Sequence, residues 1–265
     1  MADTLGAPSR AATRAAGVLG PVTMVRIAIV AAIVLIWEAA AASGLFYRDV
    51  VPSVVAVARA LVRVLADASF YWHLSVTMLE IAAALAIGGT AGLVIGIALG
   101  GSRLLSKAIE PYLYYLGPTP KIIFFPVLIM LFGIGPGSKV AMGAISCFFP
   151  IVLSVAAAMR QIPLVLIRVG QSFRAGPWDM ALKVYIPAMR HPIINGFRLG
   201  LGIALIGTLL AETKMSNRGI GHLIIQAYAL FDMPRMYAML IILFAFAIGA
   251  NSLLARAGKA DGTMG

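Results

Sequence analysis

The chain has 265 residues, of which 61% are hydrophobic and only 12% are charged, and its formal net charge is +11. A soluble domain carries about 25% charged residues, so this composition excludes an ordinary soluble globular protein. Several apolar runs approach the ~20 residues that a helix needs to cross a bilayer, whereas the alternation of barrel strands is absent. The sequence therefore predicts an all-α, polytopic membrane protein whose positive charge lies in short loops and needs no nucleic-acid partner.

The chain begins with residues 1–20, which are rich in Ala, Gly, Ser and Thr. We expect a disordered cytoplasmic tail here and no cleavable signal peptide. A six-span transmembrane domain is expected over 21–258, and a C-terminal tail over 259–265. Its apolar runs predict spans at 25–45, 74–99, 108–132, 139–159, 193–211 and 236–254.

The polar interval at 46–73 separates the first two spans. Pro52-Ser53, followed by spaced apolar residues, predicts a capped amphipathic helix at the membrane surface. The second span then carries a stripe of glycines at strict four-residue spacing, which favours close packing against a neighbouring helix. These helix-packing residues are Gly88, Gly92, Gly96 and Gly100.

The third span is interrupted near its middle by Pro118, Pro120 and Lys121. Prolines remove backbone donors, and freed carbonyls inside a membrane are tolerated only where they face protein or water. Two interpretations stay open. The kink lines a translocation pathway, or it is a packing kink with Lys121 reaching toward the interface.

Acidic residues within or near spans are functional candidates by default, and here they are Glu38, Glu80, Glu110 and Glu212. We expect Glu110 and Glu212 to reach an interface and only Glu38 and Glu80 to lie deep, with structural pairing as the explanation for all four. The three histidines, at 73, 191 and 222, are scattered over different loops, so no metal site or cofactor is expected. Cys147 is the single cysteine.

The polar interval at 160–198 is the one long stretch that is rich in charge. It predicts two short amphipathic helices, each opening on a proline, and Pro177 after Gly176 marks the start of the second. Counting Lys and Arg places this interval and both termini in the cytoplasm. From the residues alone, docking on a protein and lying among lipid headgroups are equally good interpretations.

A family resemblance extends this interpretation. The stretch from Phe173 to Glu212 resembles the cytoplasmic loop and following span of permease subunits of binding-protein-dependent ABC importers. Trp178 and Ile186-Pro187-Ala188 fit the later half of the loop motif. Counting back from Pro187 places Arg174 where the motif has its loop glycine, and 168–170 where it has Glu-Ala-Ala.

Further segments resemble the nitrate/sulfonate/taurine branch of that family, and together they cover about residues 50–255. They are Val51-Pro52-Ser53, the run from Pro118 to Pro150, Ala211-Glu212, and Ser216-Asn217-Arg218-Gly219-Ile220-Gly221. The resemblance implies a permease subunit of a bacterial inner-membrane importer that moves a small anion such as a sulfonate, taurine or nitrate.

The chain has no GxxxxGK[ST] phosphate-binding loop, so the energy for transport must come from a partner. The resemblance implies which partners these are. These are two cytoplasmic ATPases, a second permease copy, a periplasmic binding protein on 212–235 and 46–73, and membrane lipid. No enzyme activity of its own and no cofactor are expected. With the resemblance, ATPase docking is favoured for the segment at 160–192, with Met180 and Leu182 as further apolar anchors. Its coupling residues are Phe173, Arg174, Gly176, Pro177, Trp178, Asp179, Lys183 and Pro187.

The main competing hypothesis is an ion- or proton-coupled secondary transporter. It would use Glu38, Glu80 or Lys121 as coupling sites and would need no ATPase, but inverted repeats that favour such a protein are not evident. An intramembrane enzyme lacks any assembled catalytic set.

Overall fold

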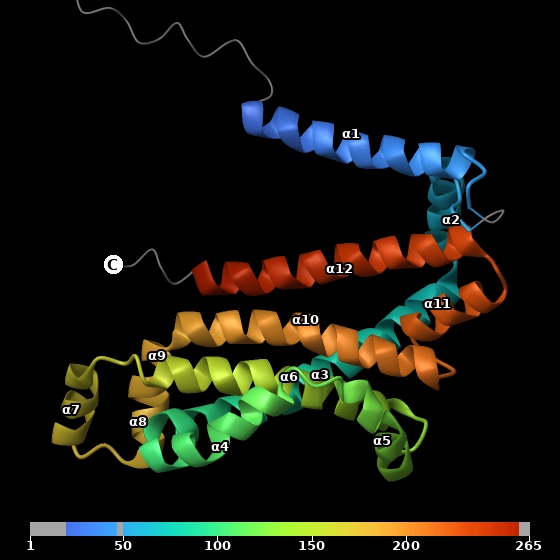
Figure 1. Ribbon diagram of the computed structural model, residues 1–265. Coiled ribbons are helices and arrows are strands. Elements are labelled where there is room, and N and C mark those ends of the chain that lie inside the picture. The colour runs from blue at the N-terminus through green and yellow to red at the C-terminus, as the bar shows by residue number, and fades with distance from the viewer. Residues whose placement is uncertain (1–19, 47–49, 260–265) are drawn as a thin grey trace, which may run out of the picture. The chain divides into compact units, whose positions relative to one another are not determined.

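The computed structural model describes residues 20–46 and 50–259, so the two predicted tails lie almost wholly outside the described residues. The regular elements within these ranges are all helices, which confirms the all-α prediction (Figure 1). The chain divides into two units, residues 1–57 and 58–265, and each is described by itself.

The first unit contains α1, Pro21–Ala42, an apolar helix that opens on a proline. Side chains in the last turns of α1 form hydrogen bonds with the segment that leads into α2, Val54–Ala66. The indole N–H of Trp37 donates to the Pro52 carbonyl at 2.9 Å, and the Val54 amide donates to the Glu38 carboxylate at 2.9 Å. Glu38, which was expected to lie deep, therefore serves an amide at the start of the next helix.

The second unit opens with the remainder of α2 and with α3, Ala68–Gly101. Helix α3 starts six residues before the predicted span because Asp67 caps it, accepting from the Ser69 amide at 2.9 Å. Hydrogen bonds from the Ser69 amide and hydroxyl also lower the pKa of the Asp67 carboxyl. Ala60 and Val64 of α2 pack in a core cluster with α11, Ile220–Ala229, and α12, Met233–Lys259.

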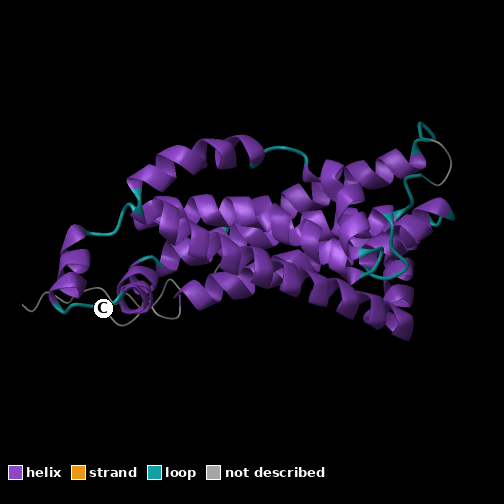
Figure 2. Cartoon of the chain, turned by 90° about the horizontal axis from the view of Figure 1, so that it is seen from below, coloured by secondary structure: helices purple, strands orange, loops and turns teal. Residues whose placement is uncertain are grey.

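The centre of this unit is a three-helix core of α3, α6 (Pro136–Met159) and α10 (Arg190–Lys214), which lie side by side in Figures 1 and 2. The glycine stripe of α3 lies against α6. A Cβ on Gly88 would overlap the Ala144 carbonyl, and one on Gly92 would lie 2.9 Å from the Ile151 side chain. Gly96 and Gly100 meet Val155 and Met159 in the same way. The absence of side chains on one helix thus lets the two backbones approach closely.

The predicted third span is two helical pieces with a sharp turn between them. Helix α4, Arg103–Leu116, and the piece Lys121–Phe132 meet at 92°. The second piece consists of the 3-10 turn η1, Lys121–Phe124, and α5, Phe125–Phe132. A single kinked helix was expected over 108–132, but the prolines of the Gly117–Pro120 turn supply no amide donors, so the helix stops rather than bends.

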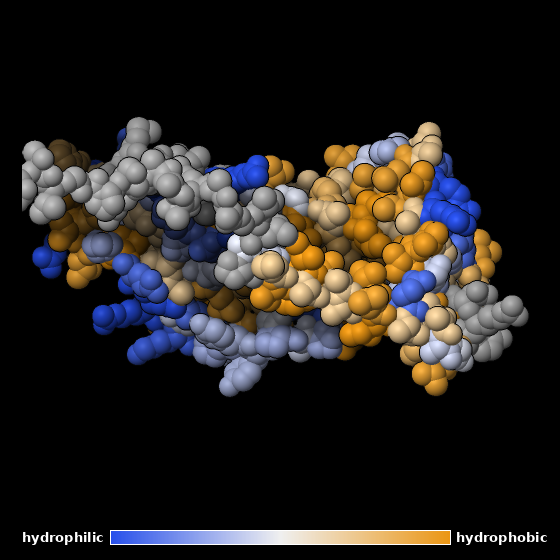
Figure 3. All heavy atoms as spheres, turned by 90° about the horizontal axis from the view of Figure 1, so that it is seen from above, coloured by the Kyte–Doolittle hydropathy of each residue, from blue (hydrophilic) through white to orange (hydrophobic). Residues whose placement is uncertain are grey.

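Five of the described helices are long and apolar enough to cross a membrane, and the bent pair brings the number to six. The five single helices are α1, α3, α6, α10 and α12. Large apolar side chains remain exposed along these helices, and Figure 3 shows such side chains over much of the face that it presents. An exposed apolar surface of this extent is what lipid and partner subunits cover.

Candidate functional site

The segment between α6 and α10 folds into two short helical arms. Helix α7 covers Leu164–Ser172 and follows Pro163, and α8 covers Pro177–Met180 with its proline at the first position. A π turn at Ala181–Tyr185 and α9, Ile186–Ala188, continue α8 toward α10. The prolines open each arm because a helix start has amides without partners, so nothing is lost there.

The turn between the two arms depends on an unusual backbone conformation at Arg174, whose φ is +52°. The Ala175 amide donates to the Gly170 carbonyl at 3.1 Å and closes this turn. A positive φ disfavours most residues other than glycine. Arg174 stands where the resembled motif has glycine, so at this position an arginine adopts the backbone conformation that glycine usually adopts.

The two arms pack against each other through Gly170 of α7. A Cβ at Gly170 would overlap the Met180 sulfur, and Met180 is itself buried. Met180, which was expected to anchor a partner, is therefore used inside the segment, because its flexible side chain fills the space above the glycine.

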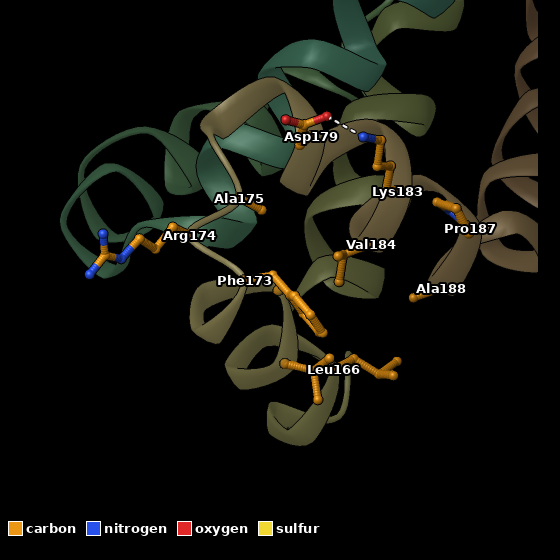
Figure 4. Close-up of a pocket in the computed structure, with 11 residues that line it drawn as sticks. Leu166, Phe173, Arg174, Ala175, Asp179, Lys183, Val184, Pro187 and Ala188 are labelled. Atoms are coloured by element: carbon orange, nitrogen blue, oxygen red, sulfur yellow. Dashed lines mark ion pairs between the residues drawn. The ribbon is translucent and has the colours of Figure 1, made fainter.

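A hollow of about 590 Å³ opens between the arms (Figure 4). Phe173, Val184 and Leu166 surround it, whereas the Arg174 side chain extends away from it. Asp179 and Lys183 form an ion pair of 2.7 Å one helical turn apart at its edge. Its lining residues are Leu166, Val169, Gly170, Phe173, Arg174, Ala175, Asp179, Lys183, Val184, Pro187 and Ala188.

This segment also leaves large aromatic side chains exposed. Phe173 is 82% exposed and Trp178 is 81% exposed, and Leu182 is also exposed. Gly176 and Pro177 place Trp178 at the start of α8. Rigid aromatic side chains of this kind dominate the energy of protein interfaces when a partner buries them.

Lys121 forms a hydrogen bond across the break in the third span. Its ammonium donates to the Gly117 carbonyl, and it lies 4.8 Å from the centre of the Phe149 ring. Pro118 and Pro120 occupy the turn itself. The lysine charge therefore serves a carbonyl that the broken helix leaves without an amide donor.

A buried cluster of charged residues lies in the three-helix core. Glu80 of α3, Lys139 of α6 and Glu212 of α10 are 4%, 1% and 1% exposed. The sequence predicts Lys139 at the very start of a span and Glu212 at an interface. Helix α6 begins earlier, at Pro136, and α10 continues to Lys214, so each residue lies within its helix and is enclosed by protein.

The sequence does contain a signal for this cluster. Glu80 lies two four-residue steps before Gly88, on the glycine stripe of α3. The buried residues Gly200, Ala204 and Thr208 of α10 continue at the same spacing to Glu212. Charged residues that extend a buried stripe are expected to be buried with it.

Histidines also meet where they were expected to be scattered. His73 of α3 and His222 of α11 stack with their ring centroids 6.1 Å apart. His191 lies in α10. Among the described residues, no group of three or more His, Cys, Asp or Glu side chains is placed to hold a metal ion.

Comparisons with known proteins place these features in a family. The model of the family described as "Binding-protein-dependent transport system inner membrane component" matches residues 88–259. A Haemophilus influenzae protein named a probable ABC transporter permease is 31% identical over 221 residues, which is 83% of this chain and 89% of that protein.

Two further relatives carry more specific names. A Bacillus subtilis permease provisionally named for transport of aliphatic sulfonates, SsuC, is 28% identical over 212 residues, or 80% of this chain and 77% of that protein. The taurine transport system permease TauC of Escherichia coli is 29% identical over 161 residues, or 61% of this chain and 58% of that protein.

Proposed function

Because the chain belongs to the family of binding-protein-dependent transport system inner membrane components, in its nitrate/sulfonate/taurine branch, we propose that it is the permease subunit of an ATP-driven importer of a small anion. Proteins of this family are transport components rather than enzymes, and ATP is hydrolysed on separate ATPase subunits. The chain is a multi-pass membrane protein with at least five candidate spans.

The observation that carries the proposal is the exposed aromatic surface of the segment at 160–192. Phe173 and Trp178 are more than four-fifths exposed, and they lie in a segment where Gly170 and Met180 are buried but most other side chains are exposed. We assign this surface to the contact with an ATPase dimer, with Arg174, Asp179 and Lys183 setting the register at its edge. The packing of Gly170 against Met180 supports this role, because a preorganised surface loses less freedom on binding.

The remaining partners follow from the same assignment. A second copy of this chain completes the transport unit, and lipid covers the remaining apolar surface. A periplasmic binding protein contacts 212–235 and the helix within 46–73. The segment at 160–192 and both termini then face the cytoplasm of a bacterial inner membrane. The pathway runs between the two permeases, beside the broken span with Pro118, Pro120 and Lys121. The names of SsuC and TauC favour a sulfonate or taurine as solute, and nitrate is the remaining anion of the same branch.

The test is a mild-detergent pull-down of the tagged chain from its native membrane, with mass spectrometry of the proteins that accompany it. The wild-type chain is expected to recover an ATPase subunit and a periplasmic binding protein. Replacing Trp178→Ala together with Arg174→Glu is expected to lose the ATPase and ATP-driven uptake, because it removes the largest exposed anchor and reverses a neighbouring charge.

The matched control is Trp72→Ala with Arg59→Glu, an exposed pair of the same residue types in α3 and α2. This control is expected to insert normally and to retain the ATPase. It is scored by recovery of the ATPase and not by uptake, because both of its residues lie in the region 46–73 that we assign to the binding protein. Full ATP-driven uptake by a normally expressed Trp178→Ala/Arg174→Glu chain would defeat the docking assignment. Recovery of the chain alone, even after cross-linking, would defeat the importer itself and favour an ion-coupled transporter.

A further inference from the structure

The first amides of α11 are held by side chains from two other helices. The Gly219 amide donates to Nδ1 of His73 at 3.1 Å, the Ile220 amide to Oγ1 of Thr77 at 2.8 Å, and the Gly221 amide to Oε2 of Glu212 at 2.6 Å. A helix start leaves these amides without partners in the helix itself. The residue at the cap position is Gly219, which has no side chain to serve them.

Glu212 is the central member of this arrangement. Its second carboxylate oxygen accepts from the Thr77 hydroxyl at 2.7 Å, so Thr77 joins the amide of Ile220 to the carboxylate. A Cβ at Gly219 would overlap the carboxyl group, and the φ of Gly219 is +94°. Only glycine fits there, and the close approach places a negative charge at the positive end of α11.

Glu80 and Lys139 decide how the buried charge is balanced. Lys139 interacts with both carboxyl groups, and its ammonium also donates to the carbonyls of Ile134 and Gly135. Both carboxyl oxygens of Glu212 accept hydrogen bonds, from the Thr77 hydroxyl and the Gly221 amide, whereas Oε2 of Glu80 is buried with no hydrogen-bond partner among the described residues. One ammonium balances only one carboxylate in a buried site, and a carboxylate without donors is costly to bury, so the neutral member of the pair is Glu80.

We propose that His73, Thr77 and Glu212 form a latch that positions the outer turn of the chain, residues 215–219, together with α11. Glu212 is the anion of this latch, Lys139 balances its charge, and Glu80 is a neutral acid in the same buried cluster. The latch joins α3, α10 and α11 at one end of the three-helix core. The turn and α11 therefore move with α3 and α10 as one body.

The consequence for transport rests on the proposed function. The turn belongs to the surface at 212–235 that we assign to the binding protein. A docked protein that moves the turn would therefore also move α10, through Glu212, and α3, through Thr77 and His73. The latch makes these three side chains positioning residues, since none of them needs to touch the solute.

The test is hydrogen exchange, followed by mass spectrometry of peptides that cover 213–224, on the purified full chain in detergent. Replacing Glu212→Gln or Thr77→Val is expected to speed exchange of the amides at 219–221 by about tenfold or more. The first replaces one of two accepting oxygens with a donor and removes the charge, and the second removes the hydroxyl. Thr77→Ser keeps the hydroxyl and is expected to restore slow exchange. Glu80→Gln is the matched control, since a neutral amide replaces a neutral acid of the same shape, and it is expected to leave exchange unchanged.

Unchanged exchange in both Glu212→Gln and Thr77→Val would overturn the latch. An effect of Glu80→Gln as large as that of Glu212→Gln would overturn the assignment of the proton to Glu80. A melting temperature measured on each variant separates local opening from global unfolding, because a variant that only weakens the fold speeds exchange in every helix. The experiment uses the chain alone, so the latch and the importer can fail independently.

Discussion

At the scale of single residues, the contact between α3 and α6 depends on glycines that have no Cβ. A Cβ at Gly88 would overlap the backbone carbonyl of Ala144, which cannot turn aside as a side chain can. We expect Gly88→Ala to lower the melting temperature of the purified chain, at a cost of about 1–3 kcal/mol from overpacking.

The control for this prediction is Gly202→Ala in α10. A Cβ added at Gly202 would have no atom within 4 Å, and this glycine lies on an exposed part of its helix. Alanine is favoured over glycine in a helix, so the control is expected to be neutral or slightly stabilising. Equal melting temperatures for the two variants would show that the glycine stripe is not needed for close packing.

At the scale of elements, the end of the broken span depends on one glycine. Gly133 ends α5 with φ +74° and ψ −179°, a conformation that residues with a side chain avoid. Gly133→Ala is expected to destabilise the chain by about 1–3 kcal/mol in a thermal melt, because the backbone must distort to admit the new carbon.

Two residues later, Gly135 supplies a matched comparison. Its φ is −65° with ψ −169°, an extended conformation open to alanine, and neither glycine has an atom within 4 Å of an added Cβ. Gly135→Ala is therefore expected to melt like the wild type. A Gly133→Ala chain that also melts like the wild type would contradict the structure of this turn.

At the scale of the whole molecule, the spans imply that the two ends of the three-helix core face opposite sides of the membrane. Cys147 is the only cysteine and is buried, so a Cys147→Ala chain is a suitable background for labelling. Ser172→Cys, in the coupling segment, is expected to react with an impermeant maleimide only after the membrane is opened. Asn217→Cys, in the outer turn, is expected to react in intact spheroplasts. Labelling of both from the same side would contradict the proposed orientation.

Much of the fold could be predicted from the sequence, because helix formation depends on local properties. Apolar runs located the helices, and the prolines at 163 and 177 located the starts of the two arms. The helix ends were less well predicted. Asp67 begins α3 early and Gly135-Pro136 begins α6 early, and neither signal depends on hydropathy.

The candidate site divides in the same way. The exposed aromatic residues of the coupling segment follow from local sequence, since an amphipathic helix that opens on a proline must present one face outward. The conformation of Arg174 does not, because a helix that ends in a left-handed turn usually has glycine there, and here the turn forms at an arginine.

By itself, the sequence determined the helical class, the membrane and the resemblance to an importer permease, since each depends on composition or on short motifs. Only the tertiary structure decided that Glu80, Lys139 and Glu212 meet and that Glu212 caps α11. Their side chains come from helices far apart in the chain. The relative position of those helices along their axes is set by the close packing of glycines against neighbouring backbones, which no single segment of sequence contains.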